Sequence, residues 1–472
     1  MKRLFYTLLF CLPCVLIACG GSDDTLGGDD NPPVVVPPDE ETVDSRLLYN
    51  GIRLPEQWPP VRSSSSELEK GMSPFYLSNK PSVINISVGR QLFVDNFLIE
   101  STNLKRTFYY PEYYSGNPIL TPEQDWEKTG TKGAAFAAPF SDGVWYDEKE
   151  GKYKMWYMAG GGSYATNGAG ITCYAESTDG IRWTKPTLSI VAGTNIVDYN
   201  SERDASVIWM DKQESNASKR YKMFLVARES GKWRYHYKTS PDGKVWRAAA
   251  QSEPIADRST VYKNPFRNVW VYSMRHNVRV NANKLVRARD YNENADPEAG
   301  TKKAEALLSA FWFGPWANEQ RHTDYPNIAP AIYNQDATPY ESIMLGFFSV
   351  WQGPENDVCA SDNVIKRNQV MVGYSRDGYS WFREDMNPFH AVNTTTSDAW
   401  NQGNLQSVAG APLIVGDKLY FYLSGRRLRG TQEITTTGLA MLRRDGFASM
   451  KGTGELQTPL LKFDGSYFFV NA

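Results

Sequence analysis

Three aspartates stand at the start of three similar apolar stretches of the chain. Asp204 lies in "SERDASVIWMD" (201–211), Asp257 in "ADRSTVYKNP" (256–265) and Asp336 in "NQDATPYESIMLG" (334–346). In each stretch the acid is followed by a small or polar residue and then by Ser or Thr, at the beginning of a β-prone run. Carboxylates that meet in one place repel one another and lose hydration, which pushes their pKa values apart. Such a group can supply one general acid and one general base.

A structural explanation stands beside the chemical one. An Asp in front of a strand commonly serves as a turn or cap residue, and a turn residue could also recur at one offset. The aspartates of the Asp-Gly pairs are expected to be structural in this sense: Asp179, Asp242 and Asp377.

Repeated β-hairpins are the elements that must position these carboxylates. One kind of hairpin has an Asp-Gly turn, which suits a tight connection because Gly adopts positive φ without strain. Its copies are "CYAESTDGIRWTKP" (173–186), "HYKTSPDGKVWRAA" (236–249), "GYSRDGYSWFRED" (373–385) and, more weakly, "MLRRDGFASM" (441–450). A second kind, with aromatic and aliphatic alternation, lies between these copies at 144–160, 207–227, 261–275, 341–351 and 412–425.

One hairpin of each kind gives four strands, and five such units fit between residues 84 and 455. The sequence therefore predicts an all-β protein, a five-bladed β-propeller, with a short helix inserted at 294–314. A β-sandwich would not explain the repeat. Because the innermost strands of a propeller begin around one opening, Asp204, Asp257 and Asp336 are expected to face a common axial pocket.

The ends of the chain are expected to lie outside this repeat. Residues 1–18 have the basic start and short apolar core of a signal peptide. Their end, "LIACG", resembles a bacterial lipobox, which implies lipid attachment to Cys19. An acidic and Pro-rich tether at 19–45 and an extension at 46–83 that packs on the propeller would follow. Residues 456–472 would form a closing strand or a remnant of a β-sandwich.

From "GRQLFVDNFLIE" (89–100) to "RRDGFASM" the chain resembles the five-bladed propeller glycoside hydrolases related to families 32 and 43, and the uncharacterised bacterial lipoproteins that are family 32-like. Arg203-Asp204 matches the Arg-Asp motif of those hydrolases, which implies that Asp204 stabilises the transition state. The "NDPNG" and "EC" motifs are missing, so Asp95 and Glu341 are the nearest candidates for the nucleophile or base and for the acid.

Other residues are candidates for substrate binding. Arg203 and Arg258 could pair with carboxylates or with a uronate, because a guanidinium makes bidentate contacts with them. The remaining candidates are His276, Gln402, Asn404 and Trp351.

The sequence thus predicts a glycoside hydrolase acting on a plant or algal polysaccharide fragment, held by a lipid at the outer membrane, on the cell surface, as a monomer. A surface glycan-binding lipoprotein without turnover and a propeller phosphorylase remain alternatives. The net charge of −2 gives no electrostatic case for nucleic acid. Cys173 and Cys359 lack metal-type spacing, and neither a metal nor a cofactor is expected.

Overall fold

The computed structural model describes residues 44–128, 134–167, 170–281, 284–396, 398–430 and 432–471. The fold is all-β: strands dominate the described residues, and the helices are short. The expected signal peptide and Cys19 lie outside the described residues.

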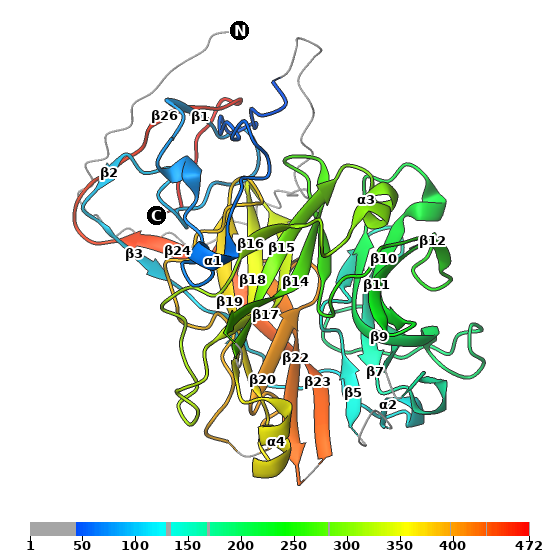
Figure 1. Cartoon of the computed structure of the whole chain (residues 1–472). Helices are drawn as coiled ribbons and strands as arrows, with labels where there is room; N and C mark the ends of the chain where they lie inside the picture. Colours follow the sequence, from blue (N-terminus) through cyan, green and yellow to red (C-terminus); the bar gives the residue numbers. More distant parts are fainter. Residues whose placement is uncertain are drawn as a thin grey trace.

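The chain forms consecutive antiparallel groups of strands, which follow one another through the molecule in Figure 1. The first comprises β5 (Ala135–Ala138), β6 (Val144–Asp147), β7 (Lys152–Ala159) and β8 (Gly170–Ser177). The next two are meanders of β9 (Ile196–Met210), β10 (Tyr221–Glu229), β11 (Lys232–Ser240) and β12 (Arg247–Gln251), and of β13 (Thr260–Asn264), β14 (Val269–Asn281), β15 (Lys284–Asn294) and β16 (Ala310–Phe313). They are followed by β17 (Ala331–Tyr340), β18 (Ile343–Gly353) and β19 (Arg367–Ser375), and by β20 (Asn404–Val408), β21 (Leu413–Val415), β22 (Lys418–Arg429) and β23 (Gln432–Arg443).

Helices occupy connections. They are α1 (Ser64–Glu67), α2 (Asp125–Lys128), α3 (Pro297–Lys303) and α4 (Asn356–Asp362), with single 3-10 turns at Phe75–Leu77, Gly162–Tyr164 and Ala217–Lys219. Helix α3 falls within the predicted insertion, where Asp296 caps it by accepting the Ala299 N–H. Helix α4 was not predicted, because its seven residues carry no clear helical period. No helix among the described residues is both long and apolar enough to cross a membrane.

The Asp-Gly turns have the structural role expected of them. The Asp179 carboxylate accepts the N–H groups of the residues two and three places on. Asp242 and Asp377 accept the equivalent pairs of N–H groups. A Ser two residues earlier adds its hydroxyl oxygen as acceptor for the Gly N–H in each turn, so the repeated unit is Ser-x-Asp-Gly.

Aromatic side chains fill the core and connect one group of strands to the next. Trp156 of β7 is fully buried, and its Nε1–H donates to the Gly243 carbonyl in the turn after β11 at 2.6 Å. Trp312 of β16 makes the corresponding bond to the Tyr379 carbonyl after β19 at 3.0 Å. Each indole therefore buries its ring and satisfies its single donor against a neighbouring group.

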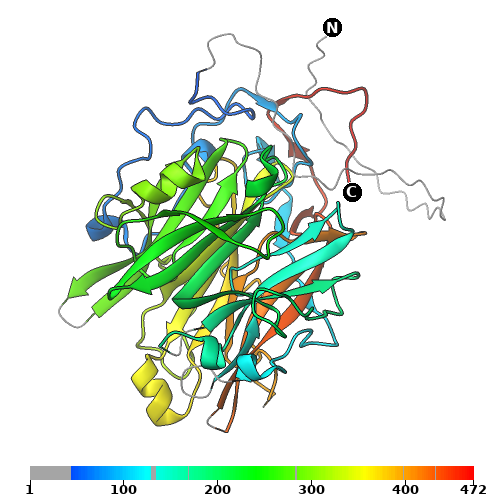
Figure 2. The same cartoon turned by 90° about the vertical axis from the view of Figure 1, so that its right-hand side faces the viewer.

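The start of the first predicted unit pairs with the end of the chain. Residues 84–110 pair with the C-terminal segment: β1 (Val83–Asn85) with β26 (Leu460–Lys462), β2 (Ser101–Thr102) with β25 (Leu456–Gln457), and β3 (Lys105–Phe108) with β24 (Ala448–Lys451). The short strand β4 (Glu112–Tyr113) pairs with β23. Figures 1 and 2 show both terminal segments together at one end of the molecule, with α4 at the other end.

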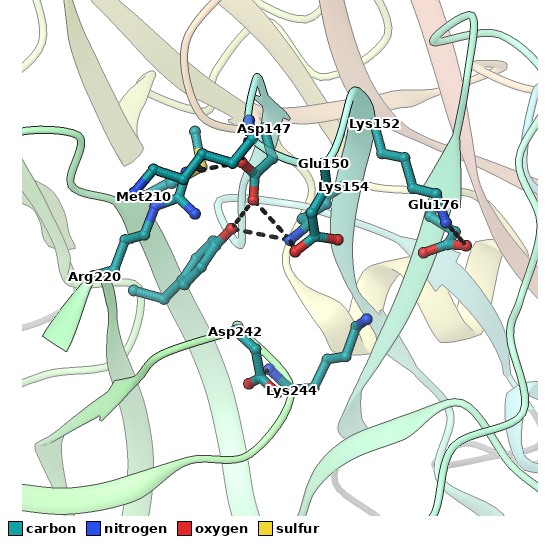
Figure 3. A network of polar contacts seen from close by, with 12 residues as sticks. Asp147, Glu150, Lys152, Lys154, Glu176, Met210, Arg220, Asp242 and Lys244 are labelled. Atoms are coloured by element: carbon teal, nitrogen blue, oxygen red, sulfur yellow. Dashed lines mark hydrogen bonds and ion pairs between the residues drawn. The ribbon is translucent and has the colours of Figure 1, made fainter. Parts of the chain in front are cut away.

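A buried ion network joins the first two groups of strands (Figure 3). Lys154 of β7 and Asp147 of β6 are both fully buried, and the Lys154 ammonium donates to the Asp147 carboxylate at 2.8 Å. The Tyr221 hydroxyl of β10 donates to the same carboxylate at 2.6 Å, and Arg220 donates to it at 2.8 Å. Burial opposes ionisation, but the hydrogen bonds from Lys154, Tyr221 and Arg220 hold the pKa of Asp147 well below its ordinary value.

We predict that Asp147→Ala lowers the free energy of unfolding by about 3 kcal/mol, since it removes the principal partner of a buried ammonium. Glu150, which also accepts from Lys154, limits the loss. Urea denaturation measures the change. The matched control is Lys152→Ala, which removes an ion pair with Glu176 at the surface and should cost less than about 1 kcal/mol. Equal losses for the two variants would contradict the assignment.

Candidate active site

The first strands of successive groups are irregular where they approach one another. Strand β9 pairs with β8 as far as Arg203, and it pairs with β10 on its other side. Its register against β10 shifts after Arg203, so that Asp204 and Ala205 form a bulge. Strand β17 shifts register at Tyr333, and β20 shifts at Ser407. Because a bulge breaks the ladder and re-aims a side chain, these strands can turn polar groups toward a shared region.

Three residues at these approaches have left-handed backbone conformation: Phe140 (φ 45°), Arg258 (φ 54°) and Ser407 (φ 66°). The backbone N–H of each donates to a side chain of another group of strands rather than to a ladder partner. The acceptors are Ser424 for Phe140, Asp204 for Arg258 and Ser349 for Ser407. The three bonds hold the turn after β5, the segment before β13 and the strand β20 against neighbouring strands.

Asp204 and Asp257 lie together. The Asp204 carboxylate accepts the Arg258 N–H at 2.8 Å and pairs with its guanidinium at 3.1 Å. Asp257 lies 2.7 Å from Nε of Arg275, an ion pair that is not aligned as a hydrogen bond. Burial and the neighbouring Asp204 charge raise the pKa of Asp257, against the opposing effect of Arg275, Arg258 and Arg287. The two carboxyl groups therefore occupy different electrostatic environments.

Asp336 is buried apart from this pair. Its Oδ2 accepts from the Asn334 side chain at 2.9 Å and from the Val408 N–H of β20 at 3.2 Å. Burial raises the pKa of Asp336 to about 7, although hydrogen bonds from Ser141, Val408 and Asn334 oppose the rise. Arg289 connects Asp336 with the residues around Asp257. Its charge lowers the pKa of Asp336, and its guanidinium donates to the Arg258 carbonyl at 2.9 Å.

Arg203 forms an ion pair with Asp142, a carboxylate that the sequence analysis did not predict for the site. Its guanidinium donates to Asp142 at 2.7 Å, and both side chains are buried. Burial raises the pKa of Asp142, against the attraction of Arg203. The second oxygen of Asp142 has no hydrogen-bond partner among the described residues. Asp142 follows β5 in "PFSDGVWYD", which lacks the acid–small–Ser/Thr pattern of the other sites.

Cations surround Tyr333. The ring centroid lies 5.7 Å from the Arg258 guanidinium, 5.8 Å from that of Arg287 and 5.6 Å from the Lys366 ammonium. Neighbours enclose the tyrosine closely, yet part of its surface remains accessible to solvent. Burial would raise the pKa of Tyr333, but Lys366, Arg258 and Arg426 lower it below its ordinary value despite the opposing charge of Asp204.

Trp351, predicted as a substrate-binding residue, contacts one of these cations. The Arg287 guanidinium lies over its ring, 4.8 Å from the ring centroid. Arg258 lies 5.5 Å from the ring of Phe140, and Arg426 of β22 lies 5.9 Å from that of Phe136 of β5. The sequence pointed to Trp351 and Arg258 only. Arg287, Lys366 and Arg426 come from later strands or strand starts and stand in no repeated motif.

Asn404 is adjacent to this set, since its side chain donates to the Lys366 carbonyl at 3.0 Å. Gln402 accepts the Leu428 N–H at 3.1 Å in the loop before β20. His276 contacts Asp290 at 2.8 Å, and this hydrogen bond raises the pKa of His276 above its ordinary value. Strand alternation places His276 on the opposite face of β14 from Arg275.

Glu341 does not join the other carboxylates. It occupies the turn between β17 and β18, where it pairs with Arg90 at 2.6 Å and with Arg444 at 3.6 Å. Five residues of strand, roughly 16 Å, separate it from Asp336. Asp95 is likewise elsewhere: it is fully buried in an ion pair with Arg376 at 2.8 Å. Both glutamate and aspartate fix the N-terminal segment to the strands.

Two cavities lie outside the cluster. One, of about 300 Å³, is lined by Ala135, Arg427 and Ile434, on the opposite face of β5, β22 and β23 from Phe136 and Arg426. The other, of about 800 Å³, is lined mainly by the segment Tyr109–Ser115 and by β23. Within the described ranges, no group of three or more His, Cys, Asp or Glu side chains could hold a metal ion.

No family model and no curated protein matches the chain. Solved structures that resemble it include an N-acetylgalactosamine deacetylase from F. plautii in complex with blood group B trisaccharide, with 11% identity, a TM-score of 0.42 and coverage of 69% of this chain and 96% of that one. A glycosyl hydrolase from Bacteroides ovatus has 11% identity, a TM-score of 0.40 and coverage of 76% and 99%. A fructofuranosidase from Schwanniomyces occidentalis complexed with fructose has 12% identity, a TM-score of 0.42 and coverage of 71% and 58%. Glycoside hydrolases are thus among the structures that this chain resembles.

The pH dependence of stability should report on Asp336. Its pKa of about 7 in the folded protein exceeds the ordinary value of 3.8. Folding therefore favours the protonated acid, and stability falls as the pH rises from about 4 to 7, by up to roughly 4 kcal/mol. Asp336→Asn, which stays neutral, should flatten this part of the curve. Urea denaturation of both proteins between pH 4 and pH 8 measures it, and an unchanged slope in the variant would refute the assignment.

Proposed function

We propose that the protein is a glycoside hydrolase whose reacting groups are Asp204 and Asp257. The observation that carries the proposal is a pair of interacting carboxyl groups in unlike environments: Asp204 is paired with Arg258, and Asp257 has a pKa raised by burial and by the charge of Asp204. Glycosidases use such a pair on the two sides of the bond that they cleave. Both side chains retain some exposure, so a substrate can reach them.

In this mechanism Asp257 is the acid. Burial and the charge of Asp204 raise the pKa of Asp257, which favours this residue as the group that delivers a proton to the glycosidic oxygen as the bond breaks. Asp204, which pairs with Arg258, acts as the base that activates water, or as the nucleophile. Arg258 orients Asp204 through both its backbone N–H and its guanidinium.

We propose further that the antiparallel groups are the blades of a five-bladed propeller and that the cluster lies at one end of its axis. In support, the residues of the cluster come from strands, or from the segments beside them, in every group. The contributing elements are β5, β9, the segment before β13, β15, β17, β20 and β22. The substrate we infer is an oligosaccharide or polysaccharide, acted on by a monomer.

A glycoside phosphorylase is the second candidate, favoured by the cations around Tyr333. It would use inorganic phosphate in place of water. A binding protein without turnover is the third. Incubation of the purified protein with plant and algal polysaccharides and aryl glycosides, with and without phosphate, separates them. The proposal expects sugar release that does not require phosphate; release only with phosphate indicates the phosphorylase, and binding without release indicates the third candidate.

The two carboxylates give the sharpest test of the proposed chemistry. Asp204→Asn and Asp257→Asn should each lower kcat by about a thousandfold or more while the substrate still binds, because each removes a group that acts mainly in the transition state. The control is Asp179→Asn in a Ser-x-Asp-Gly turn, which should leave kcat nearly unchanged. If Asp179→Asn is the more damaging variant, the assignment falls.

We also propose that a lipid on Cys19 holds the protein to the outer membrane at the cell surface. The proposal rests on the resemblance of "LIACG" to a lipobox and on the acidic segment after it. Cys19→Ser should leave the precursor unprocessed or release the protein from the membrane fraction. Normal processing and normal membrane association of the Ser variant would disprove it. Cell fractionation with metabolic labelling by a fatty acid measures both.

A further inference from the structure

The cations around Tyr333 are only partly neutralised. Arg258 is matched by Asp204, and Arg426 by Glu433 at 2.6 Å. Arg287 makes one ion pair, a contact of 3.6 Å with Glu355, whose side chain is 57% exposed and therefore well screened; it also attracts the carboxylate of Asp257 without a direct contact. For the Lys366 ammonium no carboxylate partner occurs within the described part of the chain. The positive charge of Lys366 thus lacks a counter-ion, and that of Arg287 is only partly neutralised by Glu355 and Asp257.

Unused hydrogen-bond donors accompany this charge. The Nε–H groups of Arg287 and Arg426 are buried and have no acceptor among the described residues. A buried donor of this kind is costly when it stays unpaired. Donors and positive charge at one place provide what an oxyanion needs.

The cations are held in place by aromatic rings. Arg287 stacks on Trp351, Arg426 lies over Phe136 and Lys366 lies over Tyr333. Such stacking limits the motion of long side chains, so the site is organised before a ligand arrives. The Asn404 bond to the Lys366 carbonyl fixes the backbone from which that ammonium extends.

We infer that Lys366, Arg287 and Arg426 form an oxyanion-binding site beside the Asp204–Asp257 pair, which takes a carboxylate or sulfate carried by the sugar, or inorganic phosphate. The inference rests on the proposed function for its place in catalysis, since the anion would lie next to the bond that is cleaved. It concerns binding, however, and it can be tested without turnover. A sugar that bears an anionic group would be selected over its neutral counterpart.

Isothermal titration calorimetry with orthophosphate, sulfate, glucuronate and neutral glucose tests the site. The wild-type protein should bind at least one of the anions and not glucose. Lys366→Gln and Arg287→Gln should each weaken that binding by about tenfold or more, as expected for the loss of a charged hydrogen bond. Tight glucuronate or sulfate binding with phosphate-independent cleavage identifies an anionic sugar as the source, whereas phosphate binding with phosphate-dependent cleavage identifies the co-substrate.

Lys244→Gln is the matched control, because Lys244 also lies over a tyrosine ring, that of Tyr174 at 5.0 Å, but in an Asp-Gly turn (Figure 3). It should leave anion binding unchanged. Anion binding should also survive in Asp204→Asn, which removes a nearby negative charge but abolishes the proposed hydrolysis. Absence of anion binding by the wild-type protein, or equal affinities of Lys366→Gln and Lys244→Gln, would overturn the inference while leaving the carboxylate mechanism to its own test.

Discussion

Where three groups of strands approach their neighbours, backbone N–H groups need acceptors that no ladder supplies. Where these strands approach one another they bend, and Phe140, Arg258 and Ser407 take up left-handed backbone conformations there. An orphaned N–H in the interior costs on the order of 1–3 kcal/mol. Side chains of neighbouring groups of strands supply the acceptors, which obliges the protein to place hydroxyl and carboxylate groups near its centre.

This constraint explains how one aspartate can be both structural and reactive. Asp204 accepts the Arg258 N–H with one oxygen and faces its guanidinium with the other, so the bond that fixes the strand also fixes the carboxylate. Asp336 meets the same need at the Val408 N–H, but it is buried more completely, and the charge of Arg289 only partly offsets the effect of burial on its pKa. The same residue type is therefore paired with an arginine at one strand entry and has a pKa raised to about 7 by burial at another.

Local patterns in the sequence predicted the features that depend on residues adjacent in the chain, such as turns and strand alternation. Alternation and the Asp-Gly turns located most of the hairpins, and the repeated acid led to Asp204 and Asp257. Lys366 and Arg287 could not be found in this way, because they join the site through a fold that brings together strands distant in sequence. Glu341 was misplaced for a related reason: the strand that contains Asp336 continues to Tyr340, so Glu341 lies at the wrong end of it.

The central claim is that a sugar chain binds across Asp204 and Asp257. A crystal structure of the Asp204→Asn protein with the oligosaccharide that it binds most tightly tests this claim most directly. The account predicts that the glycosidic oxygen lies within hydrogen-bond distance of the Asp257 carboxyl group, with residue 204 on the other side of the bond. An oligosaccharide bound instead in the cavity beside Tyr109 and Tyr110, with Asp257 out of reach of any sugar, would contradict it.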